Sequence, residues 1–472
     1  MPRIPFIGAT YTLASIRAEC QRCLNYFPEM VESGVAPNGE KGYLVQAPGL
    51  RLLTTVGTGP IRATYWTSTG RLVVVSGNAV YRVDPGYVSV LIGNILTNSD
   101  FVDIADNGLE VMIVDGTACY IVSITTGVFQ VVAGLPGANR VAFLDGYFVI
   151  NNPGTGQFII SALNDGLTWD TLLDAGTAEG LPDNTVGLLV NQRQLWVFGE
   201  QSVEVYWNSG DPTFPISRVD GSFIEYGCAA AGTIQKLAGC VVWVTDNGQV
   251  MMNEGYNPKR ISNFAVEQVI HAAGDISTAT AFTYKQNGHM FYVLQLPNTT
   301  TTWVFDVATG QWHERCELIN GNLAPWRASS FADAWDDKLV GDSTNGKLYA
   351  MDFDVFTNAG DVLYRQRRSP HITADLNRLC IDKFQLDMEG GQGLDGTTLG
   401  TDPQVMLRVS RDAGYTWGSE RWTTLGGLGR FRTRALWRQL GQARDWVFEI
   451  TITDPVKATI LGALIDARGS VS

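Results

Sequence analysis

"GRLVVVSGNAVYRVD" (residues 70–84) decides the fold, because two apolar runs flank one short turn. The runs are rich in β-branched and aromatic residues, which favour extended backbone. The "SGN" between them contains Gly77 and Asn78, residue types that readily adopt a positive φ. The stretch therefore predicts a β-hairpin.

The same arrangement recurs along most of the chain. It is found at residues 107–123, 144–161, 193–207, 238–252, 287–306 and 336–352. The central turns are separated by roughly 40 to 50 residues, close to the period of four-stranded propeller blades. Hairpins alone are also typical of β-sandwiches, whereas the longer period favours a ring of blades. We predict an all-β protein whose residues 46–360 form a six- or seven-bladed β-propeller.

Both ends of the chain lack the blade pattern. After Gly360 apolar and polar residues alternate, which predicts a C-terminal antiparallel β-sandwich-like domain over residues 361–472. Its expected strands cover residues 380–388, 404–409, 434–440 and 447–453. Residues 1–45 are interpreted as an N-terminal arm and docking segment. Within the arm, "LASIRAECQRCLNYF" fits either one helical face or an extended strand.

Charge and cysteine content narrow the functional classes. The chain has 472 residues and a net charge of −13, so its surface as a whole repels nucleic acid. The stretch from Arg365 to Arg444 departs from this balance, with 13 Arg or Lys residues and fewer acids. Seven cysteines without a repeated spacing indicate reduced thiols rather than a disulfide framework. We find no signal-peptide or membrane-spanning pattern, and expect a soluble protein without a membrane anchor.

Two short motifs match the Asp-box turn of sialidase propellers. "SRDAGYTWGSERW" (410–422) has the spacing S-x-D-x-G-x-T-W, and "NDGLTWD" (164–170) is a looser match. In such a turn the Asp caps the backbone, Gly supplies the positive φ and Trp packs beneath. The predicted structural residues are Ser410, Asp412, Gly414, Thr416 and Trp417 in the first motif, and Asn164, Asp165, Gly166 and Trp169 in the second.

The Asp-boxes and the 13 tryptophans motivate a rival hypothesis, a carbohydrate-binding or carbohydrate-cleaving (sialidase-like) propeller. A sialidase also needs converging arginines, a Tyr nucleophile and an acid/base carboxylate. The arginines of the predicted propeller are few and scattered, so we predict no catalytic residues. Cys20 and Cys23 form a C-x-x-C without a second pair, and we predict neither a metal site nor a cofactor.

An arginine-rich run occupies residues 429–446, "GRFRTRALWRQLGQARDW". If it is a strand, Arg430, Arg432 and Arg434 share one face, because side chains alternate along a strand. Such a cationic face needs solvent, acidic residues or nucleic acid phosphate beside it. The three arginines are candidates for contact with DNA or another subunit.

Several stretches together identify a family. "QRCLNYFPEMVES" (21–33), "YLVQAPGLRLL" (43–53), residues 161–230 and residues 405–466 resemble, in this order, the packaged-DNA stabilisation or tail-nozzle proteins of short-tailed bacteriophages. The resemblance extends over nearly the whole chain. It implies a structural virion protein that forms a homohexameric ring, the tail nozzle or hub, below the portal and its adaptor ring. Such a ring closes the DNA channel, retains the packaged genome and takes part in DNA ejection.

The resemblance also implies partners and a location. The ring carries tail fibre, spike or needle proteins, and double-stranded DNA passes through its channel. The protein belongs to the virion tail and is assembled in the host bacterial cytoplasm. Asn25, Tyr26, Phe27 and Pro28 lie outside any blade, and their exposed-looking aromatic rings suggest docking on a neighbouring subunit or the adaptor. No catalytic residues are known for the family.

Overall fold

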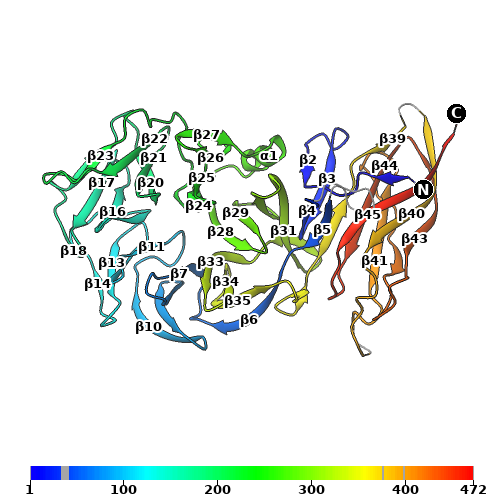
Figure 1. Cartoon of the computed structure of the whole chain (residues 1–472), viewed down its shortest axis with the longest axis horizontal. Coiled ribbons are helices and arrows are strands. Elements are labelled where there is room, and N and C mark those ends of the chain that lie inside the picture. The colour runs from blue at the N-terminus through cyan, green and yellow to red at the C-terminus, as the bar shows by residue number, and fades with distance from the viewer. Residues whose placement is uncertain (1, 33–41, 375–376, 397–398, 471–472) are drawn as a thin grey trace.

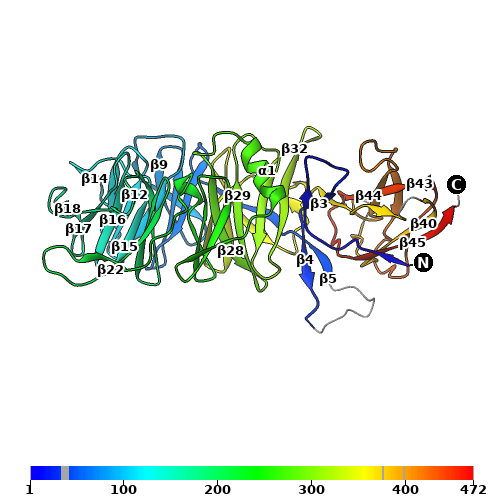
Figure 2. The same ribbon diagram turned by 90° about the horizontal axis from the view of Figure 1, so that it is seen from above.

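The computed structural model describes residues 2–32, 42–374, 377–396 and 399–470. The protein is elongated, with a propeller at one end and a β-sandwich at the other (Figures 1 and 2). The described part contains one α-helix, α1 (Phe264–Ala272), and one short 3-10 helix (Ala231–Thr233). The all-β fold predicted from the sequence is confirmed. Residues 33–41 of the expected N-terminal arm lie outside the described residues.

The hairpin predicted at residues 70–84 is the centre of the first blade. It consists of β8 (Leu72–Ser76) and β9 (Ala79–Asp84), with Gly77 at a φ of 57° in the turn. β7 (Ile61–Trp66) and β10 (Val88–Asn94) complete a four-stranded antiparallel sheet in the order β10-β9-β8-β7. Every residue of β8 is buried, because its two faces pack against the neighbouring blades.

The next five blades repeat this meander. The second contains β11 (Asp103–Asp106), β12 (Glu110–Val114), β13 (Cys119–Ser123) and β14 (Phe129–Val131). The third contains β15 (Val141–Leu144), β16 (Tyr147–Asn152), β17 (Gln157–Ala162), β18 (Asp165–Trp169) and β19 (Ala175–Thr177).

The fourth blade contains β20 (Thr185–Asn191), β21 (Gln194–Gly199), β22 (Val203–Asn208) and β23 (Ile216–Arg218). The fifth contains β24 (Gln235–Leu237), β25 (Cys240–Val244), β26 (Val250–Glu254) and β27 (Asn257–Arg260). The sixth contains β28 (Thr280–Gln286), β29 (His289–Gln295), β30 (Thr302–Asp306) and β31 (Gln311–Ile319), with β32 (Asn322–Pro325) beside β31.

The seventh blade closes the ring with a strand from the N-terminal side of the propeller. β33 (Ala328–Ala334), β34 (Asp337–Asp342) and β35 (Lys347–Asp352) are joined by β6 (Gly49–Thr55), which pairs antiparallel with β35. The short strands β36 (Thr357–Asn358) and β37 (Asp361–Val362) extend its edge. Among the described residues the propeller thus has seven blades. Closure through β6 ties the two ends of the propeller sequence together and leaves no open blade.

The C-terminal domain packs two antiparallel sheets face to face. The first contains β43 (Ala435–Ala443), β40 (Arg378–Met388) and β45 (Ile460–Ser470), followed by β5 (Gly42–Gln46) and β4 (Tyr26–Met30), with β1 (Arg3–Ile4) beside β45. The second contains β38 (Arg365–Arg368), β44 (Asp445–Ile452), β41 (Gln404–Ser410) and β42 (Arg421–Thr424), with β39 (Ile372–Thr373) beside β44. Between the sheets, the rings of Phe384 and Phe448 stack with centroids 4.6 Å apart. The predicted sandwich is confirmed.

The N-terminal arm forms strands and joins the two domains. β3 (Cys20–Leu24), flanked by β2 (Tyr11–Thr12), lies between β31 of the sixth blade and β38 of the sandwich. Leu24 pairs parallel with Glu314, and Cys23 pairs antiparallel with Arg367. One continuous sheet therefore runs from the sixth blade through the arm into the sandwich. The extended alternative is correct for "QRCLNYF", because its backbone groups find partners on both flanking strands.

Candidate functional site

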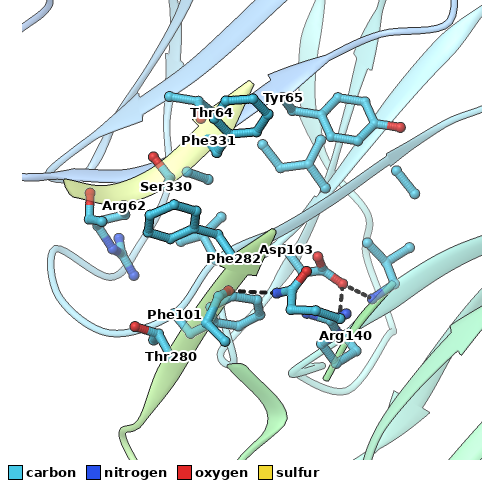
Figure 3. A pocket seen from close by; sticks show the side chains of 18 of the residues that line it. Arg62, Thr64, Tyr65, Phe101, Asp103, Arg140, Thr280, Phe282, Ser330 and Phe331 are labelled. Carbon is cyan, nitrogen blue, oxygen red and sulfur yellow. Dashed lines mark hydrogen bonds and ion pairs between the residues drawn. The ribbon is translucent and has the colours of Figure 1, made fainter. Parts of the chain in front are cut away.

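The innermost strands of the seven blades surround a cavity of about 810 Å³ on the propeller axis (Figure 3). Each of β7, β11, β15, β20, β24, β28 and β33 contributes to its wall. Phe101, Phe282 and Phe331 line the cavity together with Tyr65. Cavities of this size and aromatic character are common at ligand sites, so the charged residues of the wall decide which chemistry it supports.

The two arginines that line the cavity are engaged in internal contacts. Arg140 is buried, lies 3.2 Å from Asp103 in an ion pair and donates to the carbonyl oxygen of Ile234 at 2.9 Å (Figure 3). Burial raises the pKa of Asp103, which also accepts a hydrogen bond from the Val141 backbone. Arg62 donates to backbone carbonyls, including that of Thr97 at 2.8 Å. Within the described lining, three convergent arginines of the sialidase type are not found.

The Asp-box at residues 410–417 follows β41 directly. The Asp412 carboxylate accepts from the backbone N–H of Thr416 at 2.8 Å and from the Thr416 hydroxyl at 2.5 Å. These hydrogen bonds, led by the hydroxyl of Thr416, lower the pKa of Asp412. The hydroxyl oxygen of Ser410 accepts from the N–H of Gly414, whose φ is 90°. Trp417 lies under the guanidinium of Arg368, 4.8 Å from the ring centroid. The side chains thus fix a turn on the sandwich.

The motif at residues 164–170 makes a similar turn on the third blade. Asn164 has a φ of 57°, and the Asp165 carboxylate accepts from the N–H of Leu167 and the hydroxyl of Thr168. The Thr168 hydrogen bond lowers the pKa of Asp165. The indole N–H of Trp169 donates to the carbonyl of Gly166 at 2.7 Å. This carboxylate is also held by its own turn.

The expected exposure of residues 25–28 is wrong. Asn25, Tyr26, Phe27 and Pro28 are all buried, because their strand lies between the sixth blade and the sandwich. The Asn25 amide donates to the carbonyls of Cys316 and Tyr364, at 2.9 and 2.7 Å. Their contacts lie within the same chain. Docking of this segment on another protein stays a prediction.

Two arginines of "YRQRR" (364–368) are fully buried at the same junction. Arg365 donates to the carbonyl of Val456 at 2.6 Å and to the side chain of Gln46. Arg367 donates to the carbonyls of Phe6, Ala9 and Arg22 and to the side chain of Gln21. Burial lowers the pKa of both guanidinium groups. Two of the basic residues between Arg365 and Arg444 are therefore internal, and their hydrogen bonds join the arm to the sandwich.

A buried histidine links the arm to the sixth blade. His289 lies 2.9 Å from Asp306 through Nδ1 and 2.6 Å from Glu29 of β4 through Nε2. Hydrogen bonding to Asp306, and secondarily to Glu29, raises the pKa of His289 to about 9 despite the opposing effect of burial. The neighbouring His313 is buried without such partners, and its pKa falls to about 3. His289 is thus cationic at neutral pH and forms a charged bridge between arm and blade.

One group of potential metal ligands lies at the arm. The donor atoms of Glu19, Cys20 and His371 are within 4.8 Å of one another. Both ring nitrogens of His371 are already bonded, Nδ1 to Asp445 and Nε2 to the Ile16 carbonyl, each at 2.9 Å. Burial raises the pKa of Cys20 to about 11, which keeps its thiol protonated. A cation would therefore have to displace existing bonds at this group.

The strand expected to carry Arg430, Arg432 and Arg434 is wrong. These residues lie in the turn between β42 and β43, and β43 begins only at Ala435. Gly426 and Gly429 have φ values of 86° and 77°, which bend the chain before a strand can form. All three arginines are exposed on this turn. Their contact with DNA or a subunit stays a prediction.

Comparison with known protein families shows which family this chain belongs to. A family model described as "Bacteriophage P22 Gp10, beta-propeller" matches residues 22–356, and one described as "Bacteriophage P22 Gp10, beta-sandwich" matches residues 364–468. The chain belongs to the bacteriophage P22 Gp10 family. The resemblance to packaged-DNA stabilisation and tail proteins of short-tailed phages is thereby confirmed. The chain is a structural protein of the phage tail that assembles with other virion proteins.

Three solved structures match the chain at low sequence identity. The chain is similar to the WD40 β-propeller domain of Doa1 (10% identity, TM-score 0.41, 64% of this chain and 97% of that chain). It is also similar to the extracellular domain of the putative one component system BT4673 from B. thetaiotaomicron, at 10% identity and a TM-score of 0.44, over 80% of this chain and 48% of that chain. A third match is the N-terminal domain of Nup159, at 10% identity and a TM-score of 0.42, over 70% of this chain and 98% of that chain. No curated protein matches the chain. Among the described helices, none has the length and apolar character needed to cross a membrane.

Proposed function

We propose that the chain is the subunit of a hexameric tail nozzle, or hub, below the portal and adaptor ring of a short-tailed phage. In this role the ring closes the DNA channel, retains the packaged genome and takes part in ejection. The observation that carries the proposal is the match of Gp10 family models to both domains, residues 22–356 and 364–468. The ring carries tail fibre, spike or needle proteins, and it is assembled in the host cytoplasm.

The architecture of the chain supports a role in a channel that must withstand the pressure of the packaged DNA. The closed propeller has no open blade, and a continuous sheet joins it to the sandwich. Arg367 and the charged His289 bridge pin the intervening arm to both domains. A joint built from paired strands and buried hydrogen bonds resists hinge motion, as a channel under internal pressure requires. The role requires no chemical reaction, and we propose that the protein is not an enzyme.

The charge of the chain also agrees with a DNA conduit. A net charge of −13 repels the phosphate backbone, so DNA slides along such a wall instead of binding to it. The carbohydrate hypothesis has less support, because the arginines of the axial cavity are bound to Asp103 and to backbone carbonyls.

Genome retention tests the proposal. In the phage that encodes this chain, a nonsense mutation in its gene is propagated on a suppressing host and then grown on a non-suppressing one. We expect capsids that package DNA and then lose it, as measured by nuclease-sensitive DNA in purified particles. Supplying purified chain to the mutant lysate before the packaged DNA is lost should restore nuclease resistance. Mutant particles that keep their DNA and lack only host attachment would contradict the proposal.

A further inference from the structure

The third blade carries an exposed apolar surface. Leu163, Leu167, Leu172 and Leu173 are 59, 42, 90 and 75% exposed, and all lie on β18 or on the turns at its two ends. We call these four residues the leucine surface. Exposed leucines concentrated on one hairpin are unusual on a monomer and mark a contact with another protein.

The blade that carries the leucine surface is rich in acidic residues. Residues 141–192, which contain the third blade, include six acids and no Arg or Lys. The acids are Asp145, Asp165, Asp170, Asp174, Glu179 and Asp183. Asp145 forms an ion pair with Arg193, an exposed arginine directly after this range, and the other five acids form no ion pair within the described part of the chain. A partner for this surface must therefore offer apolar groups together with positive charge.

A surface of that kind exists at the other end of the same chain. Residues 421–444 include six arginines and no acids, and all six arginines are exposed. They are Arg421, Arg430, Arg432, Arg434, Arg438 and Arg444. Within the described structure no ion pair is formed by these side chains. We call these six arginines, with their apolar neighbours Trp422, Leu428 and Phe431, the arginine surface.

The apolar members of the arginine surface are prominent. Phe431 is 73% exposed, Leu428 65% and Trp422 57%. An aromatic ring flanked by arginines is the composition that forms the energetic centre of protein interfaces. Double-stranded DNA would pair with the arginines but would leave these apolar groups without a partner, since its exposed backbone is polar.

We propose that the leucine surface of one copy packs against the arginine surface of the next copy, head to tail. The two surfaces carry opposite charges, and both contain exposed apolar side chains. β18 and β43 lie at opposite ends of the elongated chain, so the surfaces are too far apart to meet within one molecule (Figures 1 and 2). A head-to-tail contact between different surfaces repeats from copy to copy and closes into a ring when its rotation permits. The inference rests on the proposed role as a ring subunit and names the surfaces that make the ring.

Two variants, each defective in one surface, test this pairing. The first is Leu172→Ser with Leu173→Ser, and the second is Arg432→Glu with Phe431→Ser. All four side chains are exposed, so the fold is retained. Leu96→Ser with Arg17→Glu is the matched control, because both of its residues are exposed and lie outside the two surfaces.

Sedimentation velocity of the full chain, over a wide concentration range, is the measurement. We expect the wild type and the control to assemble and each variant alone to remain monomeric. An equal mixture of the two variants should give a 1:1 heterodimer and nothing larger, because only one intact surface of each kind remains. If either surface instead paired with the same surface of another copy, the mixture would not give a 1:1 heterodimer.

Several outcomes would overturn the inference. They are assembly of either variant as in the wild type, a mixture that stays monomeric while the wild type assembles, and a wild type that is monomeric throughout. Loss of binding to a double-stranded DNA probe in the second variant, with assembly unchanged, would assign the arginines to DNA instead. None of these outcomes bears on genome retention, whereas failure of the genome-retention experiment would overturn the nozzle role itself.

Discussion

Arg367→Met should loosen the joint between the arm and the sandwich. The methionine has a similar length but donates no hydrogen bond, so the carbonyls of Phe6, Ala9 and Arg22 and the amide oxygen of Gln21 lose their donor. Each buried acceptor left without a donor costs about 1–3 kcal/mol. Removing a buried charge returns several kcal/mol of desolvation energy. We expect a net loss of about 3 kcal/mol in the free energy of unfolding.

Hydrogen exchange and urea denaturation measure this effect. Amides of residues 3–24 should exchange much faster in the variant than in the wild type, while blade strands remote from the arm keep their protection. Arg432→Met is the control, because an exposed arginine of a turn should change the unfolding free energy by less than about 0.5 kcal/mol. A loss below about 1 kcal/mol in Arg367→Met, with unchanged exchange in residues 3–24, would refute the reasoning.

Three further predictions concern the histidine bridge, the Asp-box and the cysteines. The pKa of His289 is raised to about 9, so its contacts with Asp306 and Glu29 should stabilise the fold fully below about pH 6.5 and be lost as the pH rises through 9. His289→Gln should flatten this part of the pH profile of the unfolding midpoint. Asp412→Ala should cost about 1 kcal/mol of unfolding free energy in denaturant titrations, and an unchanged midpoint would contradict its role in the turn. Cys240 and Cys380 are the partly exposed thiols, so a thiol reagent should label these two in the native protein and the buried five only after unfolding.

The repeat predicts the propeller from local pattern, but the number of blades depends on a long-range contact. The hairpin at residues 70–84 is recognisable because its residues favour both the strands and the turn. The seventh blade is completed by Gly49–Thr55, which pairs with Lys347–Asp352 from the far end of the propeller. Nothing local in "GLRLLTT" specifies that pairing, so the sequence leaves six and seven blades open.

The arm and the arginine run show that burial and local conformation depend on contacts that the local sequence does not reveal. Residues 25–28 lie outside any blade pattern, which suggests exposed aromatic rings, yet Asn25 and Phe27 are buried because two domains pack on this segment from both sides. Arg365 and Arg367 look like surface residues by composition but find backbone carbonyls inside the protein. Around Arg432, alternating spacing predicts a strand, whereas positive φ values at Gly426 and Gly429 produce a turn.

Cryo-electron microscopy of the assembled particle tests the central claim most directly. The account predicts six copies of this chain in a closed ring below the portal and adaptor, around the DNA channel, with the third blade of each copy against the sandwich of the next. A peripheral appendage with another symmetry, away from the DNA channel, would contradict it.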